Sequence, residues 1–329
     1  MKAMILAAGF GTRLFPLTVD RTKPAIPFLG KPLVGYVAEY LARFGFDDIV
    51  VNLHHEPDSV RRALGDGADF GVKIRYSVEQ PSILGTAGAL AHARALLGNE
   101  TFLVVNGKII TDIDLGIAVE SHRASGAIAT MVLLPNEAFE RFTVVDTADS
   151  RVVGFGEMAD EIHESDRDPE RPPLMYTGIQ ILEPRVFDYI PPEGYSDIVP
   201  TFYNPAIAAG ERINAHIARG RWYELSTIPR YLDISLTMLN GRDVCIGSGS
   251  DIASDSSVHN SVIWDNVTVN TGARLERTII ADGVEIPAGR EYTNAAIVRA
   301  EMMRRAGPSP AKASVGYFDD QNYIVPLTS

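Results

Sequence analysis

The feature that most constrains the fold is a repeated alternation of short apolar runs and longer amphipathic stretches over residues 1–240. Short apolar runs are typical of buried strands, and apolar residues spaced three and four positions apart are typical of helices. We expect strands at residues 3–9, 47–54, 72–79, 101–107, 127–135 and 176–184, and helices at residues 32–45, 57–67, 85–98 and 228–241. This alternation predicts an α/β domain with a mostly parallel sheet and helices on both faces.

A different pattern begins after residue 240. Small residues, Asn, Asp and Gly separate apolar residues at short regular spacing, and these apolar positions are Ile252, Val258, Val267, Val269, Leu275, Ile279, Val284 and Ile286. Short strands with turn residues at fixed offsets predict a parallel β-helix of a few coils, and a small antiparallel β domain is the alternative. We therefore expect an α/β domain over 1–240, a β-helix over 241–300 and a tail over 301–329.

Composition excludes several classes of protein. The net charge is -12, with 42 acidic and 30 basic residues, which argues against a general nucleic-acid or anionic-membrane surface. A single cysteine, Cys245, excludes an internal disulfide and a Cys-rich zinc site. The N-terminal apolar segment AMILAA is too short for a signal peptide or a membrane span, so we expect a cytoplasmic protein.

The most informative segment, LAAGFGTRLFPLT, follows the first predicted strand. Gly9 and Gly11 allow the backbone to approach a polyphosphate closely, and successive amides form an anion-binding concavity. Arg13 can bind a phosphate with its planar guanidinium, and Lys23 adds a second cation. A bare G-x-G is also common in plain turns. Leu14 stands where the Rossmann pattern has its third glycine, and no Walker lysine follows.

The complete string, continued by Lys23 and Pro24, closely resembles the signature of sugar-1-phosphate nucleotidylyltransferases, also called NDP-sugar pyrophosphorylases. SVEQPSILGTAGAL resembles the family's base-binding strand and helix, and VVNG its metal-site strand. GFGE and YTGIQI resemble its sugar-binding strands, and RWYELSTIPRYL its closing motif. The resemblance covers nearly the whole chain. It implies a Rossmann-like nucleotide-diphospho-sugar transferase domain followed by a short left-handed β-helix. The implied reaction joins a nucleoside triphosphate to a sugar 1-phosphate and releases pyrophosphate.

The resemblance also implies roles for particular residues. Those implied to bind the nucleotide are Leu6, Ala8, Gly9, Gly11, Thr12, Gln80, Gly85, Thr86 and Asn106, with Arg13 and Lys23 at the phosphates near the reacting centre. Glu157, Thr177 and Gly178 are implied to bind the sugar. Gln80 and Gly85 would read the base. Because a Gln side chain offers one donor and one acceptor, it matches the imide edge of uracil or thymine, which favours UTP or dTTP.

Three motifs depart from the family's pattern. Lys108 replaces the aspartate of Asn-Gly-Asp that holds Mg²⁺ in the family, and an ammonium cannot ligate a metal. Glu224 replaces a second metal-binding aspartate in WYELST, where Ser226 also replaces a glycine. Met158 replaces a lysine that contacts phosphate on the sugar side. Charge neutralisation at phosphorus is central to this chemistry, so the losses fall where catalysis is most sensitive.

Two interpretations follow. In the first, Lys108 supplies part of the charge of the metal, and the protein is a slow or metal-independent transferase. In the second, the protein keeps a nucleotide or nucleotide-sugar pocket without useful turnover, as a regulatory subunit. A single altered residue in an ordinary enzyme fits three departures less well. Asp112 and Asp114 follow Lys108, and we expect Asp114 to cap the next helix rather than to bind a metal. The β-helix and its aromatic tail favour a homo-oligomer.

Overall fold

In the computed structural model, which describes residues 1–327, the chain divides into two units. The first comprises residues 1–8, 37–54 and 64–222, and the second comprises residues 9–36, 55–63 and the chain from residue 223 onward.

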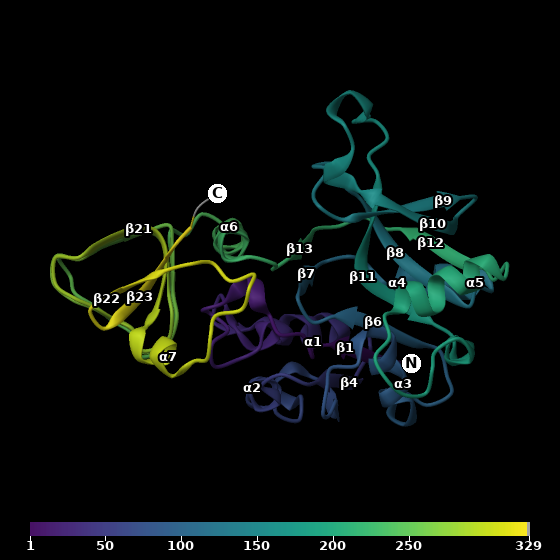
Figure 1. Ribbon diagram of the computed structural model, residues 1–329, viewed down its shortest axis with the longest axis horizontal. Helices are drawn as coiled ribbons and strands as arrows, with labels where there is room; N and C mark the ends of the chain where they lie inside the picture. The colour runs from purple at the N-terminus through teal and green to yellow at the C-terminus, as the bar shows by residue number, and fades with distance from the viewer. Residues whose placement is uncertain (328–329) are drawn as a thin grey trace. The chain divides into compact units, whose positions relative to one another are not determined.

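One mixed sheet forms the framework of the first unit (Figure 1). Its strands, in spatial order, are β5 (Lys73–Val78), β4 (Asp48–Leu53), β1 (Lys2–Leu6), β6 (Phe102–Asn106), β11 (Leu174–Leu182), β8 (Ala129–Pro135), β12 (Ile213–Ile217), β10 (Arg151–Met158) and β9 (Thr143–Ala148). The pairs β5–β4, β4–β1, β1–β6 and β8–β12 are parallel, whereas β11 and β10 run antiparallel to their neighbours. The prediction of an α/β domain with a mostly parallel sheet is therefore confirmed.

Helices cover the sheet of the first unit. α3 (Gly85–Leu97) packs on β1, β4 and β5, and α4 (Leu115–Ser125) packs on β8 and β12. Alanine and leucine side chains of α3 join Met4, Val50 and Phe102 in one buried core. The other α-helices of residues 1–327 are α1 (Leu33–Arg43), α2 (Pro57–Leu64), α5 (Asn204–Ala208), α6 (Ile228–Met238) and α7 (Ala300–Arg305). Among the described residues, every helix falls short of the length and apolar character that crossing a bilayer requires.

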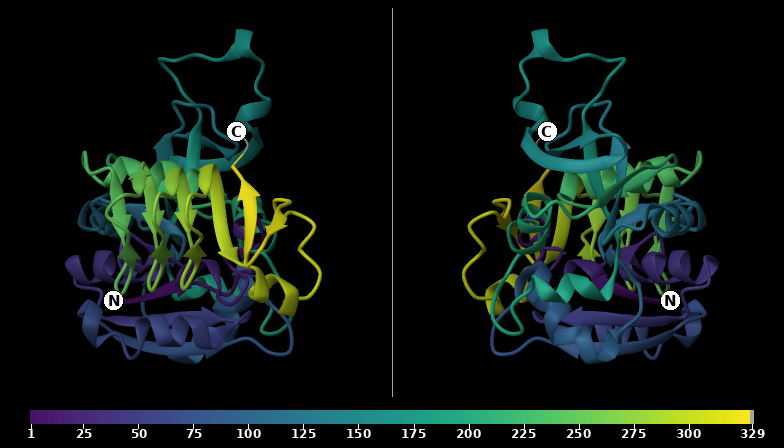
Figure 2. Two further views of the ribbon diagram at one scale, coloured as in Figure 1. Left: turned by 90° about the vertical axis from the view of Figure 1, so that its left-hand side faces the viewer. Right: turned by 90° about the vertical axis from the view of Figure 1, so that its right-hand side faces the viewer.

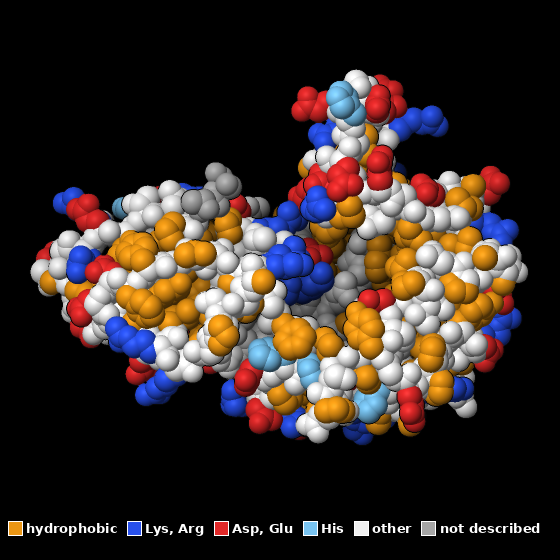
Figure 3. Space-filling model, viewed as in Figure 1, with side chains coloured by type: hydrophobic (Ala, Val, Ile, Leu, Met, Phe, Trp, Pro, Cys, Tyr) orange, Lys and Arg blue, Asp and Glu red, His pale blue; other side chains and the backbone are white. Residues whose placement is uncertain are grey.

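The segment between β10 and β11 is rich in acidic residues and proline. Most of its residues are exposed, and Figure 3 shows charged side chains covering it. It contains two short 3₁₀ turns, Ala159–Glu161 and Glu164–Asp166. This exposure is as expected from the composition, because a segment with so few apolar residues has little to bury.

A left-handed parallel β-helix forms much of the second unit, and its stacked coils are visible in Figure 2. One face consists of β14 (Val244–Ile246), β17 (Ser261–Ile263), β19 (Arg274–Ile280) and β21 (Glu291–Arg299), with β16 (Ser257–His259) also paired to β19. A second face consists of β15 (Asp251–Ile252), β18 (Thr268–Val269) and β20 (Glu285–Ile286). Cys245, Val262, Ile279 and Ala296 are aligned, so successive coils lie 17 residues apart along the chain. The β-helix prediction is confirmed, and the antiparallel alternative is wrong.

The predicted tail adds to this unit. β22 (Tyr317–Asp319) and β23 (Asn322–Pro326) form an antiparallel hairpin, and β23 pairs with β21. Residues 328 and 329 of the predicted tail lie outside the described residues. The short strands that complete the structure are β2 (Pro27–Phe28), β3 (Lys31–Pro32), β7 (Ile109–Thr111) and β13 (Trp222–Glu224).

Candidate functional site

Several predicted site residues of the first unit lie at the carboxyl edge of its parallel strands. Leu6 ends β1 and Ala8 follows it, Gln80 follows β5, and Asn106 ends β6 shortly before Lys108. The amide of Gly107 donates to the carbonyl of Leu6 at 2.9 Å, which extends the pairing of β1 and β6 beyond the strands. Ligands of open α/β sheets bind outside this edge. The sheet thus brings these segments together where a ligand is expected.

The turn that carries Lys108 is built on two glycines. The register of β11 against β6 places Gly178 opposite Asn106. Gly178 has φ +81°, and a Cβ added there would lie 2.8 Å from Cγ of Asn106. At Gly107, an added Cβ would lie 3.0 Å from both Leu6 O and the side chain of Ile5. The Asn106 side chain therefore rests on the Gly178 backbone, and the half-buried Lys108 follows directly.

Two of the predicted sugar-site residues differ in exposure. Thr177 is buried, its hydroxyl donates to Val132 O at 2.7 Å, and its carbonyl accepts the indole N–H of Trp222 at 2.8 Å. The Thr177 side chain thus ties β11 to β8, and the Thr177 backbone carbonyl holds Trp222. Glu157 is exposed near the end of β10, and the adjacent Met158 accepts the Thr143 hydroxyl at 3.4 Å from its sulfur.

A buried hydrogen-bond network that the sequence motifs did not predict supports the predicted base-binding segment. Asn52 accepts the Ala7 amide at 2.7 Å and donates to Glu79 at 2.7 Å, and the other Glu79 oxygen accepts the Leu84 amide at 2.8 Å. Asn52 and Glu79 are almost fully buried, whereas Gln80 is exposed. These hydrogen bonds join the residue after the end of β1 to the Gln80–Gly85 loop. A polar residue at the end of the apolar strand DIVVNL was the available signal.

The two carboxylates after Lys108 are already engaged. Asp112 accepts the Arg221 amide at 2.6 Å and its guanidinium Nε at 2.7 Å. Burial opposes ionisation of Asp112, but the hydrogen bonds from Arg221 outweigh it and hold the pKa of this carboxyl below its usual range. Asp114 accepts the Ile117 amide at 3.2 Å and caps α4, as predicted. Both side chains thus have structural roles.

In the second unit, the predicted phosphate segment folds back on itself. Gly11 has φ +65°, and a Cβ added there would lie 3.0 Å from Cβ of Lys23. The Thr18 hydroxyl donates to Gly11 O at 3.2 Å, and Thr12 begins a 3₁₀ turn, Thr12–Leu14. Gly11 and Lys23 are therefore neighbours, while Gly9 and Arg13 are exposed. The glycine is required both for its left-handed backbone and for this close approach.

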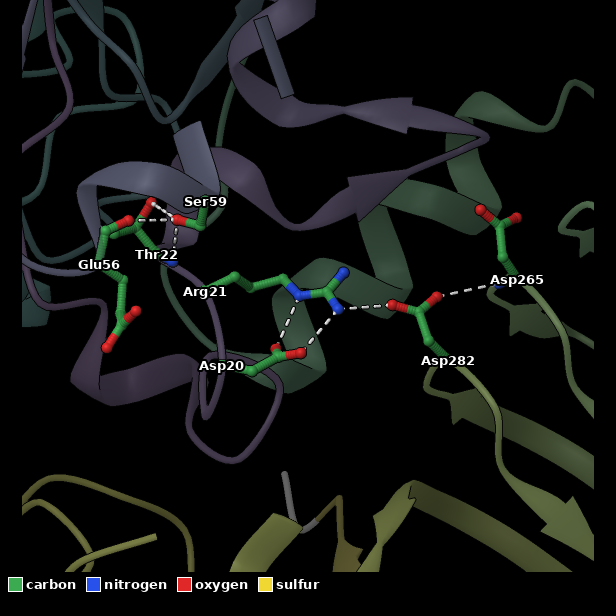
Figure 4. A network of polar contacts seen from close by, with 7 residues as sticks. All are labelled: Asp20, Arg21, Thr22, Glu56, Ser59, Asp265 and Asp282. Atoms are coloured by element: carbon green, nitrogen blue, oxygen red, sulfur yellow. Dashed lines mark hydrogen bonds and ion pairs between the residues drawn. The ribbon is translucent and has the colours of Figure 1, made fainter. Parts of the chain in front are cut away.

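Arg21, which follows the predicted phosphate segment, forms an ion pair with Asp282 of the β-helix (Figure 4). Its guanidinium donates to Asp20 at 2.8 and 3.0 Å, pairs with Asp282 at 2.7 Å and lies 5.5 Å from the Trp264 ring centre. Burial opposes ionisation of Asp20, but the hydrogen bond and charge of Arg21 hold its pKa below the usual range. The segment that leads to Lys23 is thus anchored within the second unit.

Glu224, which the resemblance places at the second metal-ligand position, also lies in the second unit. It is buried, and its backbone carbonyl accepts Nε of Arg230 at 2.8 Å. Thr227 caps the following helix α6 by accepting the Arg230 amide at 3.4 Å. Ser226 lies between Glu224 and Thr227 in the sequence.

Comparisons with known proteins identify the family. A model described as "Nucleotidyl transferase" matches residues 2–241, and one described as "GlmU-like, C-terminal hexapeptide" matches residues 239–295. This chain belongs to the nucleotidyl transferase family. A UTP–glucose-1-phosphate uridylyltransferase of Synechocystis sp. is 32% identical over 313 residues, which cover 87% of this chain and 76% of that protein. An N-acetylmuramate alpha-1-phosphate uridylyltransferase of Neisseria meningitidis is 33% identical over 240 residues, which cover 70% of this chain and 95% of that protein.

The fold comparison agrees with this family. The crystal structure of a putative glucose-1-phosphate thymidylyltransferase from Bacillus anthracis, in complex with a sucrose, matches with a TM-score of 0.61 and 26% identity. The match covers 74% of this chain and 96% of that one. The relatives are sugar-1-phosphate nucleotidylyltransferases, and the resemblance inferred from the motifs is confirmed at the level of the family.

Members of this family generally use Mg²⁺, so the donor set matters. Lys108 follows β6 at the position predicted for the metal-binding aspartate, and an ammonium group offers no lone pair to a metal. Asp112 and Asp114 are held by Arg221 and by the α4 amides. Among residues 1–327, no group of three or more His, Cys, Asp or Glu side chains is arranged to hold a metal ion. The residues at the end of β6 do not fit the usual ligand set.

Proposed function

We propose that this protein is a sugar-1-phosphate nucleotidylyltransferase-like protein with atypical use of metal. The proposed reaction is in-line attack of a sugar 1-phosphate oxygen on the α-phosphorus of a nucleoside triphosphate. The new bond forms a nucleotide sugar, and the bond to the β-phosphate oxygen breaks to release pyrophosphate. The observation that carries the proposal is Lys108, set at the end of β6 by the Gly107–Leu6 hydrogen bond and the Asn106–Gly178 contact.

The nucleotide is the part of the proposal that the most residues support. Gly9, Gly11, Thr12, Arg13 and Lys23 are proposed to supply amides and cations for the triphosphate. In the first unit, Leu6, Ala8, Gln80, Gly85 and Asn106 lie at the carboxyl edge of the sheet. The exposed Gln80, which follows the buried Glu79 in the sequence, favours UTP or dTTP.

Lys108 changes the charge available to the reaction. An aspartate with a bound dication presents positive charge to phosphate oxygens, and an ammonium can supply part of that charge directly. We propose that Lys108 does so, and that turnover is slow and depends weakly on magnesium. Glu157 and the backbone at Thr177 and Gly178 form the proposed sugar-binding part of the site. Met158 stands there in place of the lysine expected from the family, so this part lacks one cation.

The proposed setting is cytoplasmic, and the proposed assembly is a homo-oligomer formed through the β-helix and its C-terminal hairpin. The exposed side chains of Val315, Tyr317 and Phe318 support self-association, because contiguous exposed apolar residues favour an interface.

A pyrophosphate-release assay tests the proposal. Purified protein is incubated with UTP, dTTP or GTP and a panel of sugar 1-phosphates, with magnesium or with chelator, and nucleotide binding is measured in parallel by calorimetry. Binding with slow pyrophosphate release in both conditions supports the proposal. Binding with no release from any pair supports the alternative, a catalytically silent nucleotide-binding subunit. Absence of binding by every nucleotide rejects both.

A further inference from the structure

The N-terminus of α3 is capped by a chain segment far away in sequence. First-turn amides of a helix have no partner within the helix itself. Here the carbonyl of Ser196 accepts the amides of Ala87 at 2.8 Å and Gly88 at 3.1 Å, and Oδ1 of Asp197 accepts the amide of Thr86 at 3.3 Å. Because these amides are occupied, the start of α3 is not free to bind a phosphate. It serves instead to fix the segment before it.

Two glycines make this cap possible. A Cβ at Gly85, which has φ +74°, would lie 2.6 Å from Ser196 O, and a Cβ at Gly88 would lie 2.5 Å from Gly194 O. Real side chains do not approach backbone oxygens so closely. The glycines of the LGTAG motif are thus required by the capping segment, independently of any direct contact with a base.

Reciprocal hydrogen bonds lock the two segments together. The Ser196 amide donates to Leu84 O at 2.9 Å, and the Ile198 amide donates to the Thr86 hydroxyl at 2.8 Å. The Thr86 hydroxyl in turn donates to Oδ1 of Asp197 at 3.3 Å. The other carboxylate oxygen of Asp197 accepts the Tyr195 hydroxyl at 2.8 Å. Asp197 is therefore held on both oxygens and fixes Thr86 through two bonds.

The base-binding segment is thus held at both ends. Glu79 accepts the Leu84 amide just before Gly85, and Asp197 holds Thr86 just after it. We propose that Asp197 is a positioning residue that sets the geometry with which Gln80–Gly85 reads the base. This inference rests on the proposed function, since it assumes that this segment binds a nucleotide. It predicts that loss of Asp197 weakens recognition of the base and leaves recognition of phosphate intact.

The test compares ligands with and without a base. Binding of UTP, dTTP and inorganic tripolyphosphate is measured for wild type, Asp197→Ala and Asp197→Asn. The matched control is Glu193→Ala, which removes an exposed carboxylate from the same loop. Asp197→Ala should weaken the nucleoside triphosphate about tenfold, the equivalent of one lost helix cap. Tripolyphosphate binding should change less than about twofold. Asp197→Asn keeps the Oδ1 acceptor and should restore most of the affinity, and Glu193→Ala should match wild type.

Amide exchange reports on the cap itself. The amides of Thr86, Ala87 and Gly88 should exchange faster in Asp197→Ala than in Glu193→Ala. If Asp197→Ala does not fold, Tyr195→Phe removes one of the bonds to the carboxylate at an exposed position. It should weaken the nucleotide by about twofold, again without effect on tripolyphosphate.

The outcomes separate this inference from the proposed function. If wild type binds no nucleotide, the proposed function fails and the inference fails with it. If wild type binds nucleotide and Asp197→Ala binds it equally well, only the inference is overturned. Equal losses for nucleotide and tripolyphosphate would also overturn it, because Asp197 would then act on folding in general.

Discussion

Replacing Gly178 with alanine should disturb both stability and the turn that carries Lys108. The residue has φ +81° and lies directly beneath Asn106, whose Cγ would be 2.8 Å from an added Cβ. Asn106 is followed immediately by Gly107 and Lys108. Because the main chain of β11 is fixed by its register with β6, the Asn106 side chain must move when the methyl group is introduced.

Two costs add in this variant. A left-handed backbone costs a residue other than glycine about 1–2 kcal/mol. Inserting a methyl group into a closely packed contact costs a further ~1–3 kcal/mol. The free energy of unfolding should therefore fall by about 2–5 kcal/mol in Gly178→Ala.

The matched control is Gly210→Ala, because Gly210 has φ +80° and nothing lies within 4 Å of its added Cβ. In Gly210→Ala, the free energy of unfolding should fall only by the cost of the left-handed backbone. Replacing glycine with alanine also lowers the entropy of the unfolded chain, but this effect is the same in both variants. Urea denaturation followed by circular dichroism measures both, with nucleotide affinity as the second readout. If Gly178→Ala costs no more than Gly210→Ala and binds nucleotide normally, the argued contact between Gly178 and Asn106 is not a constraint on the site.

Three further predictions follow from the second unit. Arg21→Ala should lower the free energy of unfolding by about 1–3 kcal/mol, because it removes the guanidinium that pairs with Asp282 and Asp20. The control, Arg141→Ala, removes an exposed ion pair and should cost under ~0.5 kcal/mol. Equal losses for the two variants in urea denaturation would refute this prediction. Burial raises the pKa of the Cys245 thiol, and only the thiolate reacts with iodoacetamide. Alkylation of Cys245 at pH 7.5 should therefore be slower than that of free cysteine and should become faster as the pH rises. An alkylation rate equal to that of free cysteine would contradict this prediction. Light scattering at micromolar concentration should show a dimer or larger assembly, and a strict monomer would rule out self-association.

The framework strands were predictable because burial leaves a simple pattern. β1, β4 and β6 are nearly continuous apolar runs, as expected of strands covered on both faces, and the bounds differ from the predicted ones by a few residues. β9 and β12 were missed. β9 reads TVVDTA with several exposed positions, and β12 reads INAHI, in which Asn and His interrupt the apolar residues, so neither carries a strong pattern of its own. Their pairing is decided by contacts distant in sequence, such as Ile213 with Ala129.

The segments of the candidate site can be recognised in the sequence where their motifs are local. The glycine loop, the Gln80 segment and the Asn106–Lys108 turn each stand in one short stretch of sequence. The cap of α3 could not be predicted, because Asp197 lies 111 residues from Thr86 and its loop has no signature of its own. Likewise, the role of Asn52 depends on a hydrogen bond across two strands to Ala7. Supporting residues of this kind follow from tertiary structure rather than from a motif.

The most direct test of the central claim measures nucleotide binding and pyrophosphate release, with magnesium and with chelator, for wild type and Lys108→Asp. We predict that wild type binds UTP or dTTP about equally in both conditions and releases pyrophosphate slowly. Lys108→Asp restores a hard carboxylate ligand, so its binding should depend on magnesium. The combined variant with Met158→Lys and Glu224→Asp should show the larger gain in turnover. Rapid pyrophosphate release by wild type that occurs only with magnesium would contradict the account of an altered metal site.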